Sequence, residues 1–276
     1  NKEKYQIPST NFKISLLKTL VKKQSQPSQL FNFETVHKAI IYLGHYLSEY
    51  PCLLTKLIRI YKTKNDQKEL LFNFIQRCAL PSLNLTDGSA PIANEVWTLL
   101  EDLPFQIRFS LYKDWISEEC WQSHATLAQA KQITSSKCRW LLKRLTKENV
   151  KQYGRQIGRI SHSNPGILFK IALVQIQKYD NLILPIVESL RYMTNLAFDI
   201  LAFCIIDELQ DESKERLQDD GASIATWIQA MAQFCGQVYK KHDMELGGLL
   251  LMIADQLKSG TSIEVSILQD VMDRMT

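Results

Sequence analysis

Apolar residues recur at intervals of three and four along nearly the whole chain, and polar residues fill most of the positions between them. Residues with this spacing share one side of an α-helix, so the pattern predicts amphipathic helices. No segment of useful length alternates apolar and polar residues with a period of two, which argues against strands. Two clear apolar faces consist of Ile183, Ile186, Val187, Leu190 and Thr194, and of Leu246, Leu249, Leu250, Ile253 and Leu257. The predicted fold class is therefore all-α.

Several connectors between the predicted helices carry residues that begin or end a helix. Asn164 before Pro165 predicts a helix start, because Asn accepts hydrogen bonds from free amides and Pro suits the first turn. Gly260 predicts a left-handed helix end, and Thr261 with Glu264 predicts a capping box for the next helix. The predicted helices span residues 12–24, 34–48, 51–62, 66–80, 92–101, 104–116, 126–150, 151–162, 165–178, 182–194, 196–210, 222–240, 244–258 and 262–275.

The segment 196–206 is apolar on nearly all sides, so it should lie between other helices with Leu201 and Ile205 in the core. Asp199 interrupts it, and the segment is shorter than the ~18 apolar residues that a membrane span requires. Short helices around one buried helix predict an irregular α-solenoid of stacked antiparallel pairs, similar to HEAT repeats. We divide it into an N-terminal helical segment (1–90), central helices (91–160) and a HEAT-like region (161–276).

The composition supports this picture and adds a strong local asymmetry of charge. The 276 residues are 45% apolar, enough for a substantial core, and only 10 Gly and 8 Pro favour helices over turn-rich β structure. The net charge is +4, but residues 139–159 contain seven bases and one acid, whereas residues 207–220 contain seven acids and two bases. Such separation is typical of a protein with several binding surfaces.

The basic run is the main candidate for a binding site. On one helix its members follow one another every four residues: Lys143, Lys147, Lys151, Arg155 and Arg159. Leu142, Leu145, Ile157 and Ile160 would anchor the other side. We expect the stripe to contact a partner protein, or secondarily RNA phosphates, although an ordinary solvated helix face stays open. Tyr153 could stack on a base, but we favour a partly buried ring. For the acids at 207–220 we favour a solvated loop over a docking edge.

Patterns for catalysis, cofactors and metals are nearly absent. The six cysteines form no Cys-x-x-Cys pair, which predicts mostly buried, reduced thiols, and the five histidines form no His-x-x-x-His pair. Gly154 and Gly158 predict close helix packing rather than a phosphate loop. We therefore expect no catalytic, cofactor-binding or metal site, and no enzyme. Large core anchors are predicted at Trp97, Trp115, Trp121, Trp140 and Trp227.

Several longer motifs resemble one known family. The densest are KRLTKENVKQYGRQIGRISHSNPG at 143–166, QIQKYDNLI at 175–183, DILAFCII at 199–206, FCG at 234–236 and QLKSG at 256–260. LFNFI at 71–75, LPSLNL at 80–85 and LPFQIRFSLYKDW at 103–115 match less densely. Together they resemble the central region of the THO complex subunit 2 family. This family belongs to a nuclear assembly that couples transcription to messenger-RNA export.

The resemblance implies a non-enzymatic helical scaffold in the nucleus. It would hold other THO subunits and present a DEAD-box RNA helicase for loading onto nascent messenger RNA, without a membrane or a small-molecule substrate. From about residue 160 the arrangement is similar to the HEAT-like middle domain of translation-initiation scaffolds. The alternative is a direct RNA-binding helical module that uses the basic stripe. Because the chain begins without Met and ends within a helical pattern, we expect an internal fragment.

Overall fold

The computed structural model describes residues 33–64, 67–218, 223–260, 263 and 265–275. Within these ranges the elements are helices, and the β-structure consists of one isolated bridge between Leu217 and Ile224, so the all-α prediction is confirmed. The predicted helix at 12–24 and the predicted capping box of Thr261 and Glu264 lie outside the described residues. The chain divides between Thr86 and Asp87 into two compact units. The three-part division at 90 and 160 stays a prediction.

The first unit is built around an aromatic cluster. Tyr61 stacks on Phe74 with ring centroids 4.1 Å apart, and the Tyr61 hydroxyl lies 2.6 Å from His37 Nδ1. The predicted helix at 66–80 includes a π-helical turn, in which Ile75, Cys78 and Ala79 are buried and Gln76 and Arg77 are exposed. The elements are α2 (Phe33–Leu43), the 3-10 helix η1 (Gly44–Glu49), α3 (Pro51–Thr63), α4 (Lys68–Phe74), the π-helix η2 (Ile75–Ala79) and α5 (Leu80–Leu83).

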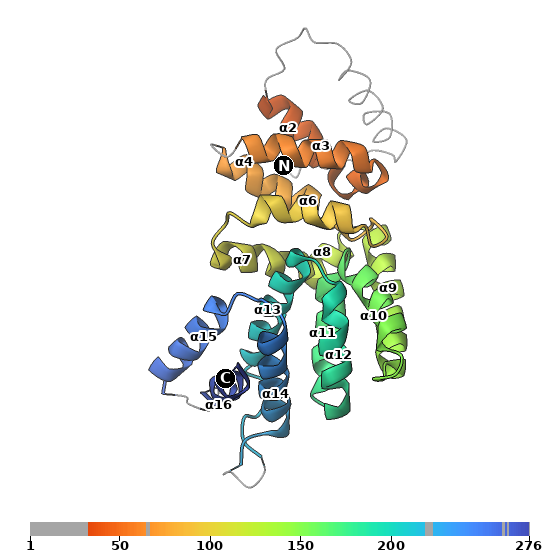
Figure 1. Ribbon diagram of the computed structural model, residues 1–276. Coiled ribbons are helices and arrows are strands. Elements are labelled where there is room, and N and C mark those ends of the chain that lie inside the picture. Colours follow the sequence, from red (N-terminus) through yellow and green to blue (C-terminus); the bar gives the residue numbers. More distant parts are fainter. Residues whose placement is uncertain (1–32, 65–66, 219–222, 261–262, 264, 276) are drawn as a thin grey trace. The chain divides into compact units, whose positions relative to one another are not determined.

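The second unit is a series of helices, most of which are joined by short connectors (Figure 1). They are α6 (Ala90–Leu100), α7 (Phe105–Ile116), α8 (Glu118–Gln122), α9 (Ala125–Arg144), α10 (Val150–Ser161), α11 (Pro165–Ile176), η3 (Asp180–Leu182), α12 (Ile183–Ser189), η4 (Leu190–Tyr192), α13 (Asn195–Leu209), α14 (Thr226–Lys241), α15 (Gly247–Lys258) and α16 (Val265–Met275). From α9 onward each helix contacts the helix two places further on, so α9, α11, α13 and α15 form one row and α10, α12, α14 and α16 another. This pattern is compatible with the predicted solenoid of helix pairs.

Helix α13 lies at the centre of the second unit, as predicted. It packs against α6, α7, α11 and α15, and Leu201 and Ile205 are 1% and 0% exposed. Its continuous apolar surface is thereby covered by neighbouring helices. Among the described residues, the structure contains no helix with both the length and the apolar character needed to cross a membrane.

A buried ionic cluster, which was not predicted from the sequence, joins α7 to α13. Arg108 on α7 is 5% exposed and Asp199 on α13 is 8% exposed. The Arg108 guanidinium donates to both Asp199 oxygens, at 2.8 and 2.9 Å, and the Tyr112 hydroxyl donates to Asp199 Oδ2 at 2.6 Å. Arg108 also donates to the Leu103 carbonyl at 2.6 Å and to Glu245 at 2.7 Å. Burial, followed by the charge of Asp199, raises the pKa of Tyr112.

The predicted helix boundaries are partly reproduced. Helix α11 begins at Pro165 behind Asn164, but the Asn164 side chain donates to Ser163 Oγ at 3.0 Å and makes no capping hydrogen bond to the helix. Gly260 has a φ of +89°, which is the left-handed helix end that the sequence predicted.

Candidate functional site

The predicted basic stripe does not lie on one helix. The sequence predicted a helix from 126 to 150, but α9 ends at Arg144 and α10 begins at Val150. Leu145 is buried and has an extended backbone (φ −69°, ψ 122°), so the chain turns a corner between the two helices. Asn149 stabilises this corner. Its side chain donates to the Arg144 carbonyl at 2.7 Å and accepts from the Thr146 amide at 2.8 Å. These local hydrogen bonds compete with helix continuation, so the stripe bends around a corner.

The five predicted basic residues are nevertheless all exposed. Lys143 lies in the last turn of α9, Lys147 lies in the connection, and the other three lie on α10. Three further exposed bases on α9 extend the charge, and together these eight define the basic surface: Lys137, Arg139, Lys143, Arg144, Lys147, Lys151, Arg155 and Arg159. The predicted apolar anchors Leu142, Leu145, Ile157 and Ile160 are buried, at 1%, 4%, 2% and 6% exposure. Whether the basic surface binds a partner stays a prediction.

Arg159 differs from the other residues of the basic surface because it forms an ion pair. Arg159 donates to Asp87 Oδ2 at 2.8 Å, and Gly88 packs so closely that an added Cβ would lie 2.4 Å from the Arg159 carbonyl oxygen. Arg159 therefore fastens the start of the second unit to α10. Among the described residues, the other seven bases have no ion-pair partner. Their charges are therefore not neutralised by ion pairs within the described part of the chain.

Trp140 corrects the prediction that all five tryptophans are core anchors. Trp115 and Trp121 are 4% and 3% exposed, and Trp97 and Trp227 are half-buried, but Trp140 is 47% exposed. The physical reason is its position on α9. Cys138, Leu141 and Leu142 point into the core, so the residue about 200° around the helix from Cys138 faces outward.

An aromatic and cationic group surrounds Trp140 on the basic surface. The Arg144 guanidinium carbon lies 4.3 Å from the Trp140 ring centroid, and the Tyr153 ring from α10 lies 6.0 Å away at an interplanar angle of 31°. Tyr153 is half-buried, as the sequence favoured. Its partner, however, is the exposed Trp140. Flat aromatic rings and a guanidinium plane of this kind can stack on nucleic-acid bases.

Two glycines hold α10 against its neighbour and so keep the basic side outward. A Cβ atom added to Gly158 would lie 2.7 Å from Tyr192 Cβ and 2.9 Å from the Tyr192 carbonyl oxygen. At Gly154 the added Cβ would lie 3.0 Å from the Tyr192 ring. The predicted role of Gly154 and Gly158 in close helix packing is confirmed.

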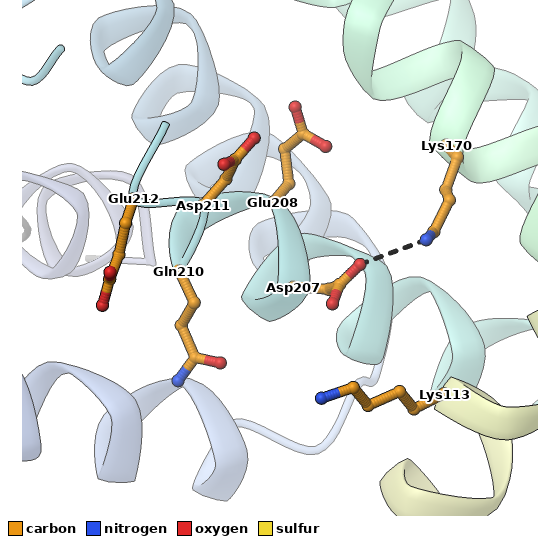
Figure 2. A pocket seen from close by; sticks show the side chains of 7 residues that line it. All are labelled: Lys113, Lys170, Asp207, Glu208, Gln210, Asp211 and Glu212. Carbon is orange, nitrogen blue, oxygen red and sulfur yellow. Dashed lines mark ion pairs between the residues drawn. The ribbon is translucent and has the colours of Figure 1, made fainter. Parts of the chain in front are cut away.

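The acidic stretch lines part of a polar pocket of about 520 Å³ (Figure 2). Lys170 pairs with Asp207 at 3.3 Å, and Lys113 reaches the pocket from α7. Glu208 pairs with Lys214 and accepts from Gln177 Nε2 at 2.8 Å. The remaining lining residues are Gln210, Asp211 and Glu212. Because two lysines line the pocket and Asp207 and Glu208 have internal partners, this surface is of mixed charge.

Most of the cysteines in the described part of the chain are buried. Cys78, Cys138, Cys204 and Cys235 are buried, Cys120 is half-buried and Cys52 is exposed, so the prediction of mostly buried thiols is confirmed. Burial raises the pKa of Cys138 to about 12. The described residues contain no group of three or more His, Cys, Asp and Glu side chains that could hold a metal ion.

Comparison with known proteins identifies the family. A family model described as "THO complex subunit 2 N-terminus" matches residues 10–155, and one described as "Transcription- and export-related complex subunit" matches residues 157–232. The human protein named THO complex subunit 2 is 42% identical over 90% of this chain. Proteins with the same name from Arabidopsis thaliana and Saccharomyces cerevisiae are 36% identical over 72% and 25% identical over 87% of the chain.

The matched region is a small part of these relatives. The chain spans 17% of the length of the human relative, 11% of the Arabidopsis relative and 16% of the yeast relative. The matches nevertheless extend through both units described above. The chain belongs to the THO complex subunit 2 family.

Proposed function

We propose that this chain serves as a non-enzymatic helical scaffold within the THO complex. In this role it organises other THO subunits in the nucleus and presents a DEAD-box RNA helicase during messenger-ribonucleoprotein assembly and transcription-coupled messenger-RNA export. The observation that carries the proposal is the 42% identity to a protein named THO complex subunit 2 over 90% of the chain.

The architecture supports a binding role. Two rows of helices present successive helix faces, a geometry that repeat proteins use for extended binding surfaces. Helix α15 also exposes Leu250, Leu251 and Leu257, at 41%, 44% and 49%. Exposed apolar side chains on one helix are typical of protein contact surfaces. The matched family models describe complex subunits, which agrees with assembly rather than catalysis.

Cross-linking mass spectrometry of the assembled complex tests the scaffold proposal. We expect cross-links from lysines of this chain to at least one other THO subunit and to the helicase. A parallel binding assay should use the purified chain against the isolated helicase. Absence of both kinds of contact, in a complex that is otherwise assembled, would contradict the proposal.

A second candidate function is direct RNA binding through the basic surface. The specific observation in its favour is the exposed Trp140. It lies on the basic surface, among Lys and Arg side chains that have no ion-pair partner in the described residues, rather than in the core. Titration with single-stranded RNA at several salt concentrations tests it, because phosphate contacts give a steep dependence of affinity on salt. Weak binding with no salt dependence would contradict direct RNA binding, and the scaffold role would be the remaining candidate.

A further inference from the structure

We propose that Trp140, Tyr153 and Arg144 form a stacking site for bases of a single-stranded nucleic acid. Lys143, Lys147 and Lys151 hold the phosphates of the same strand. This inference rests on the second proposed function, and it assigns that function to a particular site at the corner between α9 and α10.

The first argument is the placement of the aromatic side chains. Trp140 is 47% exposed although it lies on a helix whose other side is buried. Its ring has the Arg144 guanidinium at 4.3 Å and the Tyr153 ring at 6.0 Å, so three flat groups from two helices are gathered at one place. Nucleobases stack on aromatic rings and guanidinium planes, and any base offers a suitable face. The site therefore recognises nucleobases without selecting a sequence.

The second argument is the positive charge on the two helices that carry those rings and on the connection between them. Lys143 follows Trp140 by three residues at the end of α9, Lys151 precedes Tyr153 by two on α10, and Lys147 lies between them in the connection. All three are exposed and have no ion-pair partner among the described residues. Glu148 is the single acid in residues 139–159. Neutralising phosphates with such side chains releases counterions and drives binding.

A single strand fits this site better than a duplex does. In a duplex the faces of the bases are covered by their neighbours, so Trp140 would have no base on which to stack. In a single strand the bases are free to leave the stack while the phosphates stay within reach of the lysines. The chemistry is shared by RNA and DNA, and the experiment below compares the two.

The decisive measurement is the affinity of the purified full chain for labelled oligomers of one length. The probes are an oligouridylate, an oligothymidylate, a duplex RNA and an abasic ribose-phosphate strand. We expect Trp140→Ala to weaken oligouridylate binding by about 5- to 150-fold, which is the loss of stacking on one base. The same substitution should leave the weaker binding of the abasic strand unchanged. Trp140→Phe should restore most of the affinity. RNA and DNA single strands should respond alike unless a 2′-hydroxyl is contacted.

A matched pair of charge variants tests the phosphate contacts. The triple variant Lys143→Glu, Lys147→Glu, Lys151→Glu should lower the slope of log affinity against log salt by about 2, since each single-strand phosphate contact contributes about 0.7. The control variant Lys38→Glu, Lys68→Glu, Lys240→Glu has the same change in net charge at three other exposed lysines. It should reduce the slope by much less.

The outcomes distinguish this inference from the function on which it rests. If the charge variant abolishes binding but Trp140→Ala has no effect on the oligouridylate, the stacking site is wrong while RNA binding stands. If no probe binds at low salt, and Trp140→Ala instead weakens binding to the helicase or a THO subunit, the corner is a protein contact and both RNA proposals fail. Because Trp140 is exposed, circular dichroism should show an unchanged fold in each variant.

Discussion

The buried ionic cluster allows the sharpest prediction about stability. Asp199 accepts three hydrogen bonds, two from Arg108 and one from Tyr112, at 2.6 to 2.9 Å. Asp199→Ala would leave the buried Arg108 guanidinium with the Leu103 carbonyl, the largely exposed Glu245 and the Trp97 ring, whose centroid is 5.6 Å away. Removing one partner of a buried pair typically costs roughly 3–5 kcal/mol, because the other charge stays buried and uncompensated. We expect the loss in the free energy of unfolding to lie toward the lower end of this range, because Glu245 still pairs with Arg108.

Urea denaturation followed by tryptophan fluorescence is the appropriate assay. All five tryptophans lie in the second unit, so the signal reports the unit that contains the cluster. Asp207→Ala is a matched control on the same helix, because its ion pair with Lys170 is 38% and 47% exposed and should contribute less than about 1 kcal/mol.

A triple variant tests the physical reason for that loss. Arg108→Met, Tyr112→Phe and Asp199→Leu together remove the charges and the buried hydroxyl while keeping apolar volume. Replacing a whole buried ionic group by apolar side chains is often nearly neutral. We therefore expect the triple variant to be more stable than Asp199→Ala alone. The reasoning is refuted if Asp199→Ala costs less than about 1 kcal/mol, or if the triple variant is the less stable of the two.

Three further predictions concern packing and thiol chemistry. Leu201→Ala should lower the free energy of unfolding by about 2–5 kcal/mol through lost burial and a cavity, and an unchanged thermal midpoint would contradict its core position. Gly158→Ala should cost about 1–3 kcal/mol because the new methyl group meets Tyr192. Gly247→Ala, whose added Cβ would lie 3.8 Å from Glu245 Oε1, should be nearly neutral in the same denaturation assay. Iodoacetamide at pH 8 should modify the exposed Cys52 first and spare Cys138, because burial raises the pKa of the Cys138 thiol to about 12. Peptide mass spectrometry that found Cys138 modified as fast as Cys52 would contradict the burial of Cys138.

Much of the fold could be predicted because helical periodicity is a local property. The apolar faces that include Leu142, Ile157 and Leu201 repeat every three or four residues, so their burial follows from the sequence. The exposure of Trp140 was also accessible, since Cys138 and Leu141 define the inner face of α9. Treating every tryptophan as a core anchor concealed that signal.

Other features depend on contacts that periodicity does not encode. The helix end at Leu145 contains neither Gly nor Pro, and it is fixed by the two side-chain hydrogen bonds of Asn149. The sequence predicted two adjoining helices with their boundary between residues 150 and 151, whereas α9 already ends at Arg144 and a connection separates it from α10. The partner of Asp199 lies 91 residues earlier in the chain, and one sequence alone does not show which distant residue will meet it.

The spacing of the buried cluster has a consequence for synthesis on the ribosome. Arg108 and Tyr112 are translated long before Asp199, which is 91 residues beyond Arg108, and Glu245 is 137 residues beyond it. At about 5–20 residues per second, roughly 5–18 seconds separate the synthesis of Arg108 from that of Asp199. During that interval the Arg108 charge has no carboxylate to receive it and must stay hydrated. Helix α7 therefore cannot bury this side chain in its final place until α13 has left the exit tunnel.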